Sequence, residues 1–285
     1  MLSNSLNWIR RKIAKQFNPL LKIDFIKGHF FCKIFNLIRS VSGDAGRISY
    51  CDKTKLYKAG DESFYINFCE KERARFYKNG PEERVAYLGH SYFLDSVDFK
   101  DGDVVIDCGA NIGEVFFYFK MKKFNIEYIG FEPSPREFEC LKSNVEGMSL
   151  YNLGLWHEDG SLDFYISSVG ADSSIIKPKS YSHVKKISTS RLEDIYKSKN
   201  GSSIKLLKLE AEGAEPEVLL GCGSLLENIE YISADLGYER GVNEESTFLP
   251  VVNFLLKNGF EIIELNNKKL TALFKRCRQN DPRPS

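Results

Sequence analysis

Residues 104–113 read Val-Val-Ile-Asp-Cys-Gly-Ala-Asn-Ile-Gly, an apolar, mostly β-branched run that ends in a turn with two glycines. An uninterrupted apolar run of this kind is typical of a central strand in a parallel sheet, buried on both faces. Asp107 then falls at the carboxyl end of the strand, where open α/β sheets bind their ligands. Gly109 and Gly113 allow a tight turn and the close approach of a ligand to the backbone. The passage predicts an α/β fold with a cofactor at this strand end.

A second strand and a second acid follow at a spacing that nucleotide-binding βαβ units use. The candidate strand Glu127–Glu132 ends in an acid, Glu132. A carboxylate about 20 residues after the glycine turn binds ribose hydroxyls in such units. Ser134 is a good N-cap for the next helix, and Glu137 would complete a capping box. Strand, turn, helix, strand and acid in this order favour a cofactor site over a simple connecting turn.

The class of cofactor follows from what these motifs contain and lack. The chain has no Gly-x-Gly-x-x-Gly triple and no Gly-x-x-x-x-Gly-Lys-Ser/Thr loop, which disfavours dinucleotides and triphosphates. The Asp107 carboxylate would repel a phosphate but attract a cationic ligand end, such as the amino group of S-adenosylmethionine. A nicotinamide-dependent oxidoreductase is therefore the weaker alternative.

Apolar runs in the second half of the chain predict the rest of a doubly wound sheet. Residues 149–154, 204–209 and 230–234 are candidate strands, and 261–265 with 271–274 form a candidate antiparallel hairpin. A closing hairpin suits the methyltransferase version of such a sheet better than the dehydrogenase version, by analogy between folds.

Four motifs together resemble the FkbM-type S-adenosylmethionine-dependent methyltransferases. They lie in the family's order within roughly residues 85–275, and they are Asp107-Cys-Gly-Ala-Asn-Ile-Gly113, Phe131-Glu-Pro133, Thr189-Ser-Arg-Leu-Glu-Asp194 and Lys208-Leu-Glu-Ala-Glu-Gly-Ala-Glu215. The resemblance implies a class I methyltransferase core, that is, a Rossmann-like, mostly parallel sheet with a C-terminal antiparallel hairpin. It implies a cofactor pocket lined by Asp107, Gly109, Asn111, Gly113 and Glu132. The implied reaction is methyl transfer to a hydroxyl, and the expected acceptor is a sugar of a glycan, surface polysaccharide or glycosylated lipid.

Candidate catalytic residues lie at the ends of later strands. Family members commonly have Lys-Ile-Asp-Val-Glu-Gly where this chain has Lys208-Leu-Glu-Ala-Glu-Gly213, so Glu210 keeps the charge on a longer side chain. A hydroxyl acceptor has to lose its proton, and Glu210 is the first candidate for the base. Asp235 should lie beside it, and the two acids could instead hold Mg²⁺. Glu212 is expected either to contact the acceptor or to accept a hydrogen bond within the turn. Glu215 is expected in the first turn of the next helix, where the helix dipole favours an acid. Because Glu210 replaces the family's aspartate, a non-catalytic cofactor-binding module is a second alternative.

A few further residues are weaker candidates for the pocket. Asn152 is expected at the edge of the adenine, and Ser173 and Ser174 in a loop that faces the site. His157 and His183 are placed in loops, where either could act as a base, although a surface histidine is the commoner outcome.

Positive charge is concentrated in the first 40 residues. They hold eight basic side chains and one acidic one, whereas the whole chain has a net charge of +1. Leu6, Ile9, Ile13 and Phe17 recur at helical spacing opposite basic residues. This pattern predicts an amphipathic helix that either lies on an anionic membrane surface or packs on the core with its lysines in water. Nucleic-acid binding is disfavoured, because the charge is confined to one end of an otherwise acidic chain.

The chain divides into four predicted segments. These are a helical basic extension (1–43), a lead-in segment that packs on the core (44–99), the methyltransferase domain (100–275) and a loose tail (276–285). The seven cysteines are scattered and include no Cys-x-x-Cys pair, which indicates neither a zinc site nor a disulfide framework. The expected location is the cytoplasm, at the inner face of the membrane if the extension binds lipid.

Overall fold

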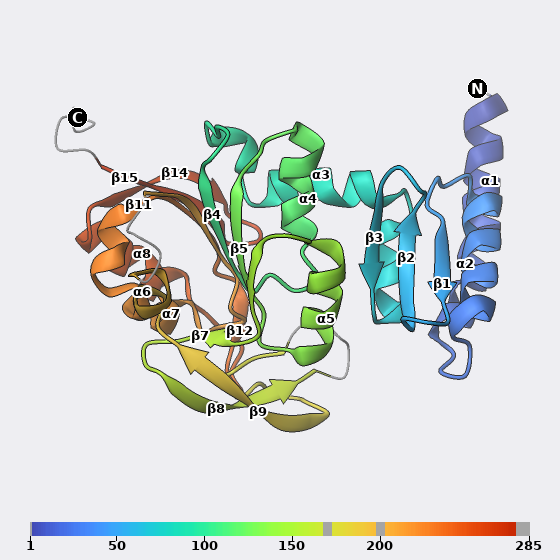
Figure 1. Ribbon diagram of the computed structural model, residues 1–285. Coiled ribbons are helices and arrows are strands. Elements are labelled where there is room, and N and C mark those ends of the chain that lie inside the picture. Colours follow the sequence, from blue (N-terminus) through green and yellow to red (C-terminus); the bar gives the residue numbers. More distant parts are fainter. Residues whose placement is uncertain (1, 168–172, 198–202, 278–285) are drawn as a thin grey trace.

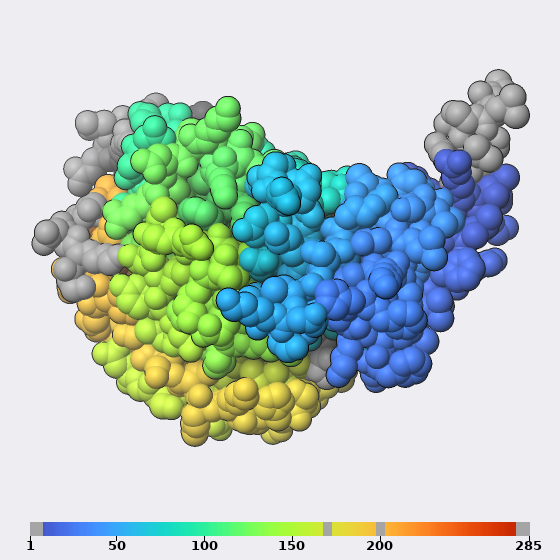
Figure 2. Space-filling model, turned by 45° about the vertical axis from the view of Figure 1, so that its right-hand side comes forward, coloured from blue at the N-terminus to red at the C-terminus, as the bar shows by residue number. Residues whose placement is uncertain are grey.

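The computed structural model describes residues 2–167, 173–197 and 203–277, with residues 2–7 described by their backbone alone. Two parts lie side by side in it: a large sheet covered by helices, and a smaller N-terminal unit (Figure 1). Figure 2 shows the N-terminal unit as a lobe that projects from the larger part.

The large sheet has seven strands in the order β14-β15-β11-β10-β4-β5-β6. Their bounds are β4 Val104–Cys108, β5 Glu127–Phe131, β6 Ser149–Tyr151, β10 Ile204–Leu209, β11 Ile229–Asp235, β14 Phe260–Asn266 and β15 Thr271–Arg276. Pairs β4–β5, β5–β6, β4–β10 and β10–β11 are parallel, whereas β15 runs antiparallel to both β11 and β14. The predicted class I methyltransferase sheet with its C-terminal hairpin is confirmed.

Helices cover both faces of this sheet because its strands are apolar on both sides. Val105 points into a core shared with α3 (Pro81–Ser91), α4 (Glu114–Lys122) and α5 (Pro135–Asn144). Its neighbours on β4, Val104 and Ile106, point into the opposite core. That core is shared with α6 (Leu192–Lys197), α7 (Glu215–Cys222), η4 (Gly223–Asn228) and α8 (Phe248–Lys257). The alternation follows from the two-residue period of a strand.

The N-terminal unit is a small antiparallel sheet covered by helices. Its elements are α1 (Leu2–Phe17), η1 (Asn18–Lys22), α2 (Gly28–Ser42), β1 (Ile48–Cys51), β2 (Leu56–Gly60), β3 (Tyr65–Phe68) and η2 (Lys71–Tyr77). The short helix η3 (Leu94–Ser96) belongs to the larger part, where Asp95 contacts α4. Phe31 and Phe35 of α2 pack in one core with Tyr57 and Phe68 of the sheet, and this core continues onto the α4–α5 side of the large sheet. The four predicted segment boundaries stay predictions.

A second small sheet lies near the carboxyl ends of the central strands, in the order β7-β9-β8 (Figure 1). It consists of β7 (Gly154–Leu155), β8 (Gly160–Ile166) and β9 (His183–Ser190). A separate short ribbon pairs β12 (Tyr238–Arg240) with β13 (Glu245–Ser246). The prediction that His183 lies in a loop was wrong, because it begins β9. The polar sequence of β9 gives little local signal, and pairing with β8 makes it a strand.

Candidate active site

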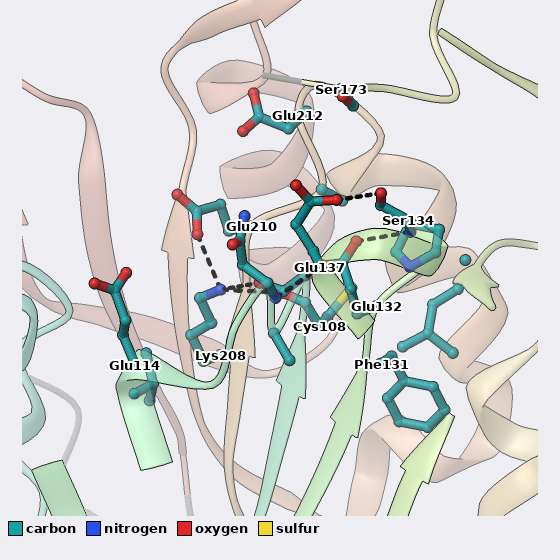
Figure 3. A pocket seen from close by; sticks show the side chains of 18 of the residues that line it. Cys108, Glu114, Phe131, Glu132, Ser134, Glu137, Ser173, Lys208, Glu210 and Glu212 are labelled. Carbon is teal, nitrogen blue, oxygen red and sulfur yellow. Dashed lines mark hydrogen bonds and ion pairs between the residues drawn. The ribbon is translucent and has the colours of Figure 1, made fainter. Parts of the chain in front are cut away.

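A pocket of about 270 Å³ opens at the carboxyl ends of β4, β5 and β10, the edge where the sequence predicts a cofactor (Figure 3). Its walls differ in character. One wall is apolar and contains Phe131, Leu153, Leu155, Phe164 and Ile175. The polar groups include Gly109, Asn111, Glu132, Ser134, Glu137, Ser173, Lys208, Glu210, Glu212 and Glu239. A third wall comes from the N-terminal unit, α3 and the residue after it, with Arg73, Phe76, Arg84 and Tyr92.

Glu132 is a buried carboxylate that the backbone holds in place at the end of β5. Its Oε2 accepts a hydrogen bond from the Asn111 amide at 2.8 Å, and its Oε1 accepts one from the Ser134 amide at 2.8 Å. Burial raises the pKa of Glu132 to about 8. Because a carboxylate oxygen can accept two hydrogen bonds, each oxygen keeps capacity for a ligand hydroxyl.

The capping box predicted at Ser134 is not formed. Pro135 begins α5, so the predicted start of the helix is right. However, the Ser134 amide binds Glu132, and the Ser134 hydroxyl donates to the carboxylate of Glu137. The acid at the strand end has taken the amide that the capping box would use, and Glu137 lines the pocket instead.

The two glycines of the turn make room for the protein's own atoms. Gly109 has a φ of +73°, and a Cβ there would lie 1.9 Å from the carbonyl oxygen of Glu210. Gly113 has a φ of +85°, and a Cβ there would lie 2.6 Å from a methyl group of Val145. Gly109 lines the pocket, whereas Gly113 packs against α5 and the residue after it. The predicted approach of a ligand to Gly113 gains no support from this packing and stays a prediction.

Asp107 lies beneath the pocket and is fully buried. The Tyr128 hydroxyl donates to its Oδ2 at 2.6 Å, and the Nζ of Lys208 lies 3.1 Å from its Oδ1. Burial raises the pKa of Asp107, although Lys208 opposes the shift. Its charge is thus balanced inside the protein. This placement argues against the direct contact with a cationic ligand that the sequence analysis predicts.

Lys208 connects the ends of β4 and β10. Its Nζ lies 3.0 Å from Oε2 of Glu210 and donates to the carbonyl oxygens of Cys108 and Gly109 at 3.3 and 2.9 Å (Figure 3). Burial alone would lower the pKa of Lys208, but Asp107 and Glu210 outweigh it and raise this pKa, so the side chain is a cation. No role was predicted for Lys208, although a lysine within the apolar run 204–209 was the available signal.

Glu210 is held by Lys208 yet remains open to the pocket. Its side chain is 33% exposed, and it forms a hydrogen bond with Tyr92. Burial would raise the pKa of Glu210, but the Lys208 charge and the Tyr92 hydroxyl lower it below its ordinary value. An ionised carboxylate at this position can accept a hydrogen bond from a ligand.

Asp235 lies next to Glu210, as predicted, because Leu209 pairs with Ala234 across β10 and β11. Burial and the charge of Glu210 raise the pKa of Asp235 to about 6. Asp235 is not among the described residues that line the pocket. The structure therefore brings Asp235 to Glu210 and not to the pocket itself.

The predicted magnesium site at Glu210 and Asp235 gains no support. Within the described parts of the chain, the one group of three side chains close enough to share a cation consists of Cys69, Glu70 and Glu137. Glu210 is instead paired with an ammonium group.

Asn152 shapes the turn after β5 and does not line the pocket. Its Nδ2 donates to the carbonyl oxygens of Glu132 and Pro133 at 2.8 and 3.2 Å. The predicted contact with an adenine gains no support, because Nδ2 is used by the backbone and the residue lies outside the pocket lining. His157 is exposed and, like His183, lies outside the pocket lining.

The loop after β10 is fixed by buried polar contacts. The Ser174 hydroxyl donates to the carbonyl of Glu212 at 2.7 Å, while Ser173 lines the pocket. Glu215 does more than start α7, because its Oε1 accepts the amides of Ala211 and Gly213 at 2.8 and 3.1 Å. These contacts aim Glu212 at the pocket (Figure 3).

A second buried charge cluster was missed altogether. Glu114 contacts Arg73 at 2.7 Å and Arg84 at 3.1 Å, and it accepts a hydrogen bond from Tyr77 at 2.6 Å. Burial would raise the pKa of Glu114, but the two guanidinium groups lower it to about 2. The cluster ties η2 and α3 to the pocket wall. From the sequence, Glu114 looks like an ordinary acid in the first turn of a helix, because its partners lie far upstream.

The family model described as Methyltransferase FkbM domain matches residues 107–262, more than half of the chain. The protein belongs to the FkbM methyltransferase family. It is an S-adenosylmethionine-dependent methyltransferase, which decides against both alternatives raised by the sequence.

Two proteins of similar sequence and one solved structure of similar fold can be compared with this chain. "Methyltransferase 1" of Beauveria bassiana (strain ARSEF 2860) is 28% identical over 192 residues, covering 59% of this chain and 74% of that protein. "2-O-methyltransferase NoeI" of Sinorhizobium fredii (strain NBRC 101917 / NGR234) is 25% identical over 181 residues, covering 57% and 74%. A solved methyltransferase from Aquifex aeolicus, described as SAM dependent, is 12% identical with a TM-score of 0.38, covering 68% of this chain and 97% of that one. The fold assignment depends on the strand order and not on that score.

The pocket of this FkbM methyltransferase fits S-adenosylmethionine. Within the described chain, the Oδ1 of Asn111 is buried without a hydrogen-bond partner, and Asn111 lines the pocket, so it can accept from a ligand N–H or O–H. Glu132 keeps acceptor capacity for ribose hydroxyls. The apolar wall around Phe131 and Leu155 can cover an adenine ring.

Glu132→Gln is expected to weaken cofactor binding by about 10–100-fold. The amides of Asn111 and Ser134 each donate to one carboxylate oxygen, and a glutamine side chain has only one oxygen to accept them. Wild-type affinity should also rise with pH between about 6 and 8, by at most about tenfold per unit. Ribose hydroxyls favour the ionised form of Glu132, whose pKa in the free protein is about 8. Calorimetry with S-adenosylhomocysteine in buffers of different ionisation enthalpy would measure the proton release. Unchanged affinity in Glu132→Gln would contradict this role.

Proposed function

We propose that this FkbM methyltransferase transfers the methyl group to a hydroxyl oxygen of a sugar, within a glycan, a surface polysaccharide or a glycosylated lipid. The observation that carries the proposal is Glu210, an ionised carboxylate that lines the cofactor pocket and is held by Lys208 at 3.0 Å. The relative from Sinorhizobium fredii, named as a 2-O-methyltransferase, supports an oxygen acceptor.

The acceptor side of the pocket suits a ligand rich in hydroxyl groups. Glu210 and Glu212 lie on the opposite side of the pocket from Ser134 (Figure 3), and Glu239 also lines the pocket. An ionised carboxylate can accept hydrogen bonds but cannot donate them, so such groups favour a ligand with hydroxyl donors and disfavour a phosphate. Phe76 and Tyr92 add aromatic surface to the same pocket, against which the apolar face of a sugar ring can pack.

Bound S-adenosylmethionine supplies a methyl group with electrophilic character on a sulfonium. Glu210 would accept a hydrogen bond from the acceptor hydroxyl and take its proton as the oxygen forms its bond to the methyl carbon. The carbon–sulfur bond would break in the same step, and its electron pair would stay on the sulfur of the departing S-adenosylhomocysteine. Lys208 and Tyr92 hold the carboxylate in one orientation, which orients the acceptor oxygen for attack. The partial exposure of Glu210 gives the proton a route to solvent.

Incubation with a methyl-labelled cofactor and a panel of neutral oligosaccharides and glycolipids tests the proposal. We expect label in an O-methyl sugar that is released by acid hydrolysis and is stable to mild base. The matched Glu210→Gln enzyme should bind the cofactor and transfer little label. Label found only on amine acceptors, or on no sugar of the panel by an enzyme that binds the cofactor, would overturn the sugar hydroxyl as acceptor.

A further inference from the structure

Helix α1 carries an apolar stripe that faces solvent. Ile9, Ile13 and Phe17 lie four residues apart, so they share one side of the helix, and each is nearly half exposed. Ala14 is buried. An ordinary surface helix turns its apolar stripe toward the core, whereas this stripe is open. A contiguous exposed apolar stripe indicates an interaction surface.

The same region has a strong positive charge, and its ion pairs with other described residues involve only His29, with Asp52, and Arg39, with Asp44. Its exposed basic side chains are Arg10, Arg11, Lys12, Lys15, Lys22, Lys27 and Lys33, and the exposed acidic side chain within residues 8–40 is Asp24. The remaining basic residue, Arg39, is buried and has a structural role, because it contacts Asp44 at 3.0 Å and Asn18 at 2.8 Å. The exposed cations are therefore available to an anionic partner.

Large apolar side chains project among these cations. Trp8 is 62% exposed, and the Nζ of Lys12 lies 4.8 Å from the centre of its ring. Phe25 is exposed in the loop before α2, and Phe30 and Leu37, seven residues apart, are exposed on one side of α2. Exposed aromatic residues with basic neighbours are the composition of helices that lie in a membrane interface.

We propose that α1, α2 and the loop between them form a peripheral binding surface for bilayers that contain anionic lipids. The apolar stripe would enter the headgroup region while the cations contact lipid phosphates. Helix α1 has 16 residues, and no helix in the described part of the chain is both long and apolar enough to cross a bilayer. The surface lies at the end of the molecule away from the large sheet (Figure 1).

The position of the two tryptophans makes a direct test possible. Trp8 is 62% exposed and Trp156 is 9% exposed, and the chain has no third tryptophan. We expect the full-length protein to sediment with vesicles of phosphatidylcholine and phosphatidylglycerol, and less with phosphatidylcholine alone. Its emission should shift to the blue on binding, and Trp8→Phe should abolish the shift. Added salt should weaken binding, because exposed charges are screened.

Matched substitutions distinguish binding through this surface from nonspecific adsorption of the protein to vesicles. The double variant Ile13→Asp with Phe17→Asp should lower vesicle affinity by at least about tenfold, since it places charge in the apolar stripe. Leu249→Asp, at a leucine that is 68% exposed on α8, should leave affinity unchanged. Failure of the wild type to bind anionic vesicles would overturn the proposal, as would equal loss in both variants. A dimer in vesicle-free buffer that the double variant disrupts, without vesicle binding by the wild type, would assign the stripe to a second copy of the chain.

Discussion

Replacing Lys208 by methionine is expected to lower the free energy of unfolding by about 3–5 kcal/mol. The substitution leaves Asp107 fully buried without the ammonium group 3.1 Å away that balances its charge. It also removes the donor to the carbonyl oxygens of Cys108 and Gly109. Urea denaturation followed by circular dichroism, for wild type and Lys208→Met side by side, would measure the loss.

Lys205 on the same strand provides the matched control. It forms an ion pair with Glu230 at 3.1 Å, but these side chains are 12% and 24% exposed, whereas those of Lys208 and Asp107 are 2% and 0% exposed, so Lys205→Met should cost clearly less than Lys208→Met. Adding Asp107→Asn to Lys208→Met should recover part of the loss, because position 107 then no longer holds an unpaired, fully buried charge. Equal losses for the two lysines would show that the buried pair does not hold the strand ends together.

The loss in Lys208→Met should also depend on pH with a definite sign. Burial raises the pKa of Asp107, and removing the cation raises this pKa further. A carboxyl group with a raised folded-state pKa destabilises the protein above its unfolded pKa, and the penalty disappears as the pH falls. Lys208→Met should therefore approach wild-type stability in acid, whereas a loss caused by packing alone would not change with pH.

Local pattern in the sequence was enough to predict the sheet and part of the site. The runs around Val105, Tyr128 and Leu207 are apolar on both faces, so each is read as a buried strand without knowledge of its neighbours. Glu132 was found because its position relative to the glycine turn is fixed by the length of one βαβ unit. These features depend on contacts within a short stretch of chain.

Features made by long-range contacts were missed or misread. Glu114 meets Arg73 only when η2 packs on α4, and nothing near Glu114 in the sequence indicates this. Asp107 was read as a ligand-binding acid because its partner Lys208 lies 101 residues later. An isolated motif gives the side chain at a strand end, but the neighbouring strand decides whether that side chain faces the pocket or the core.

Glu210→Gln is expected to lower kcat by about 10²–10⁴-fold while changing cofactor affinity little. The amide keeps the size of the side chain and can still hydrogen bond to Tyr92, but it cannot take a proton from the acceptor. Glu210→Asp restores the residue common in the family and should retain more activity than Glu210→Gln. Steady-state kinetics with an acceptor that the wild type methylates would measure the loss of kcat. Calorimetry of cofactor binding would show separately whether the affinity for the cofactor changes.

The pH profile of the same reaction tests whether Asp235 contributes. Glu210 alone should remain ionised well below neutral pH, because Lys208 and Tyr92 lower its pKa. Asp235, with a pKa of about 6, gains a proton at mildly acidic pH, and its negative charge then no longer raises the proton affinity of Glu210, which becomes a weaker base. Activity should therefore fall below about pH 6 in the wild type. This fall should be absent in Asp235→Asn, which should have lower activity at neutral pH. A wild-type profile that stays flat to pH 5, with full activity in Glu210→Gln, would remove both acids from the chemistry.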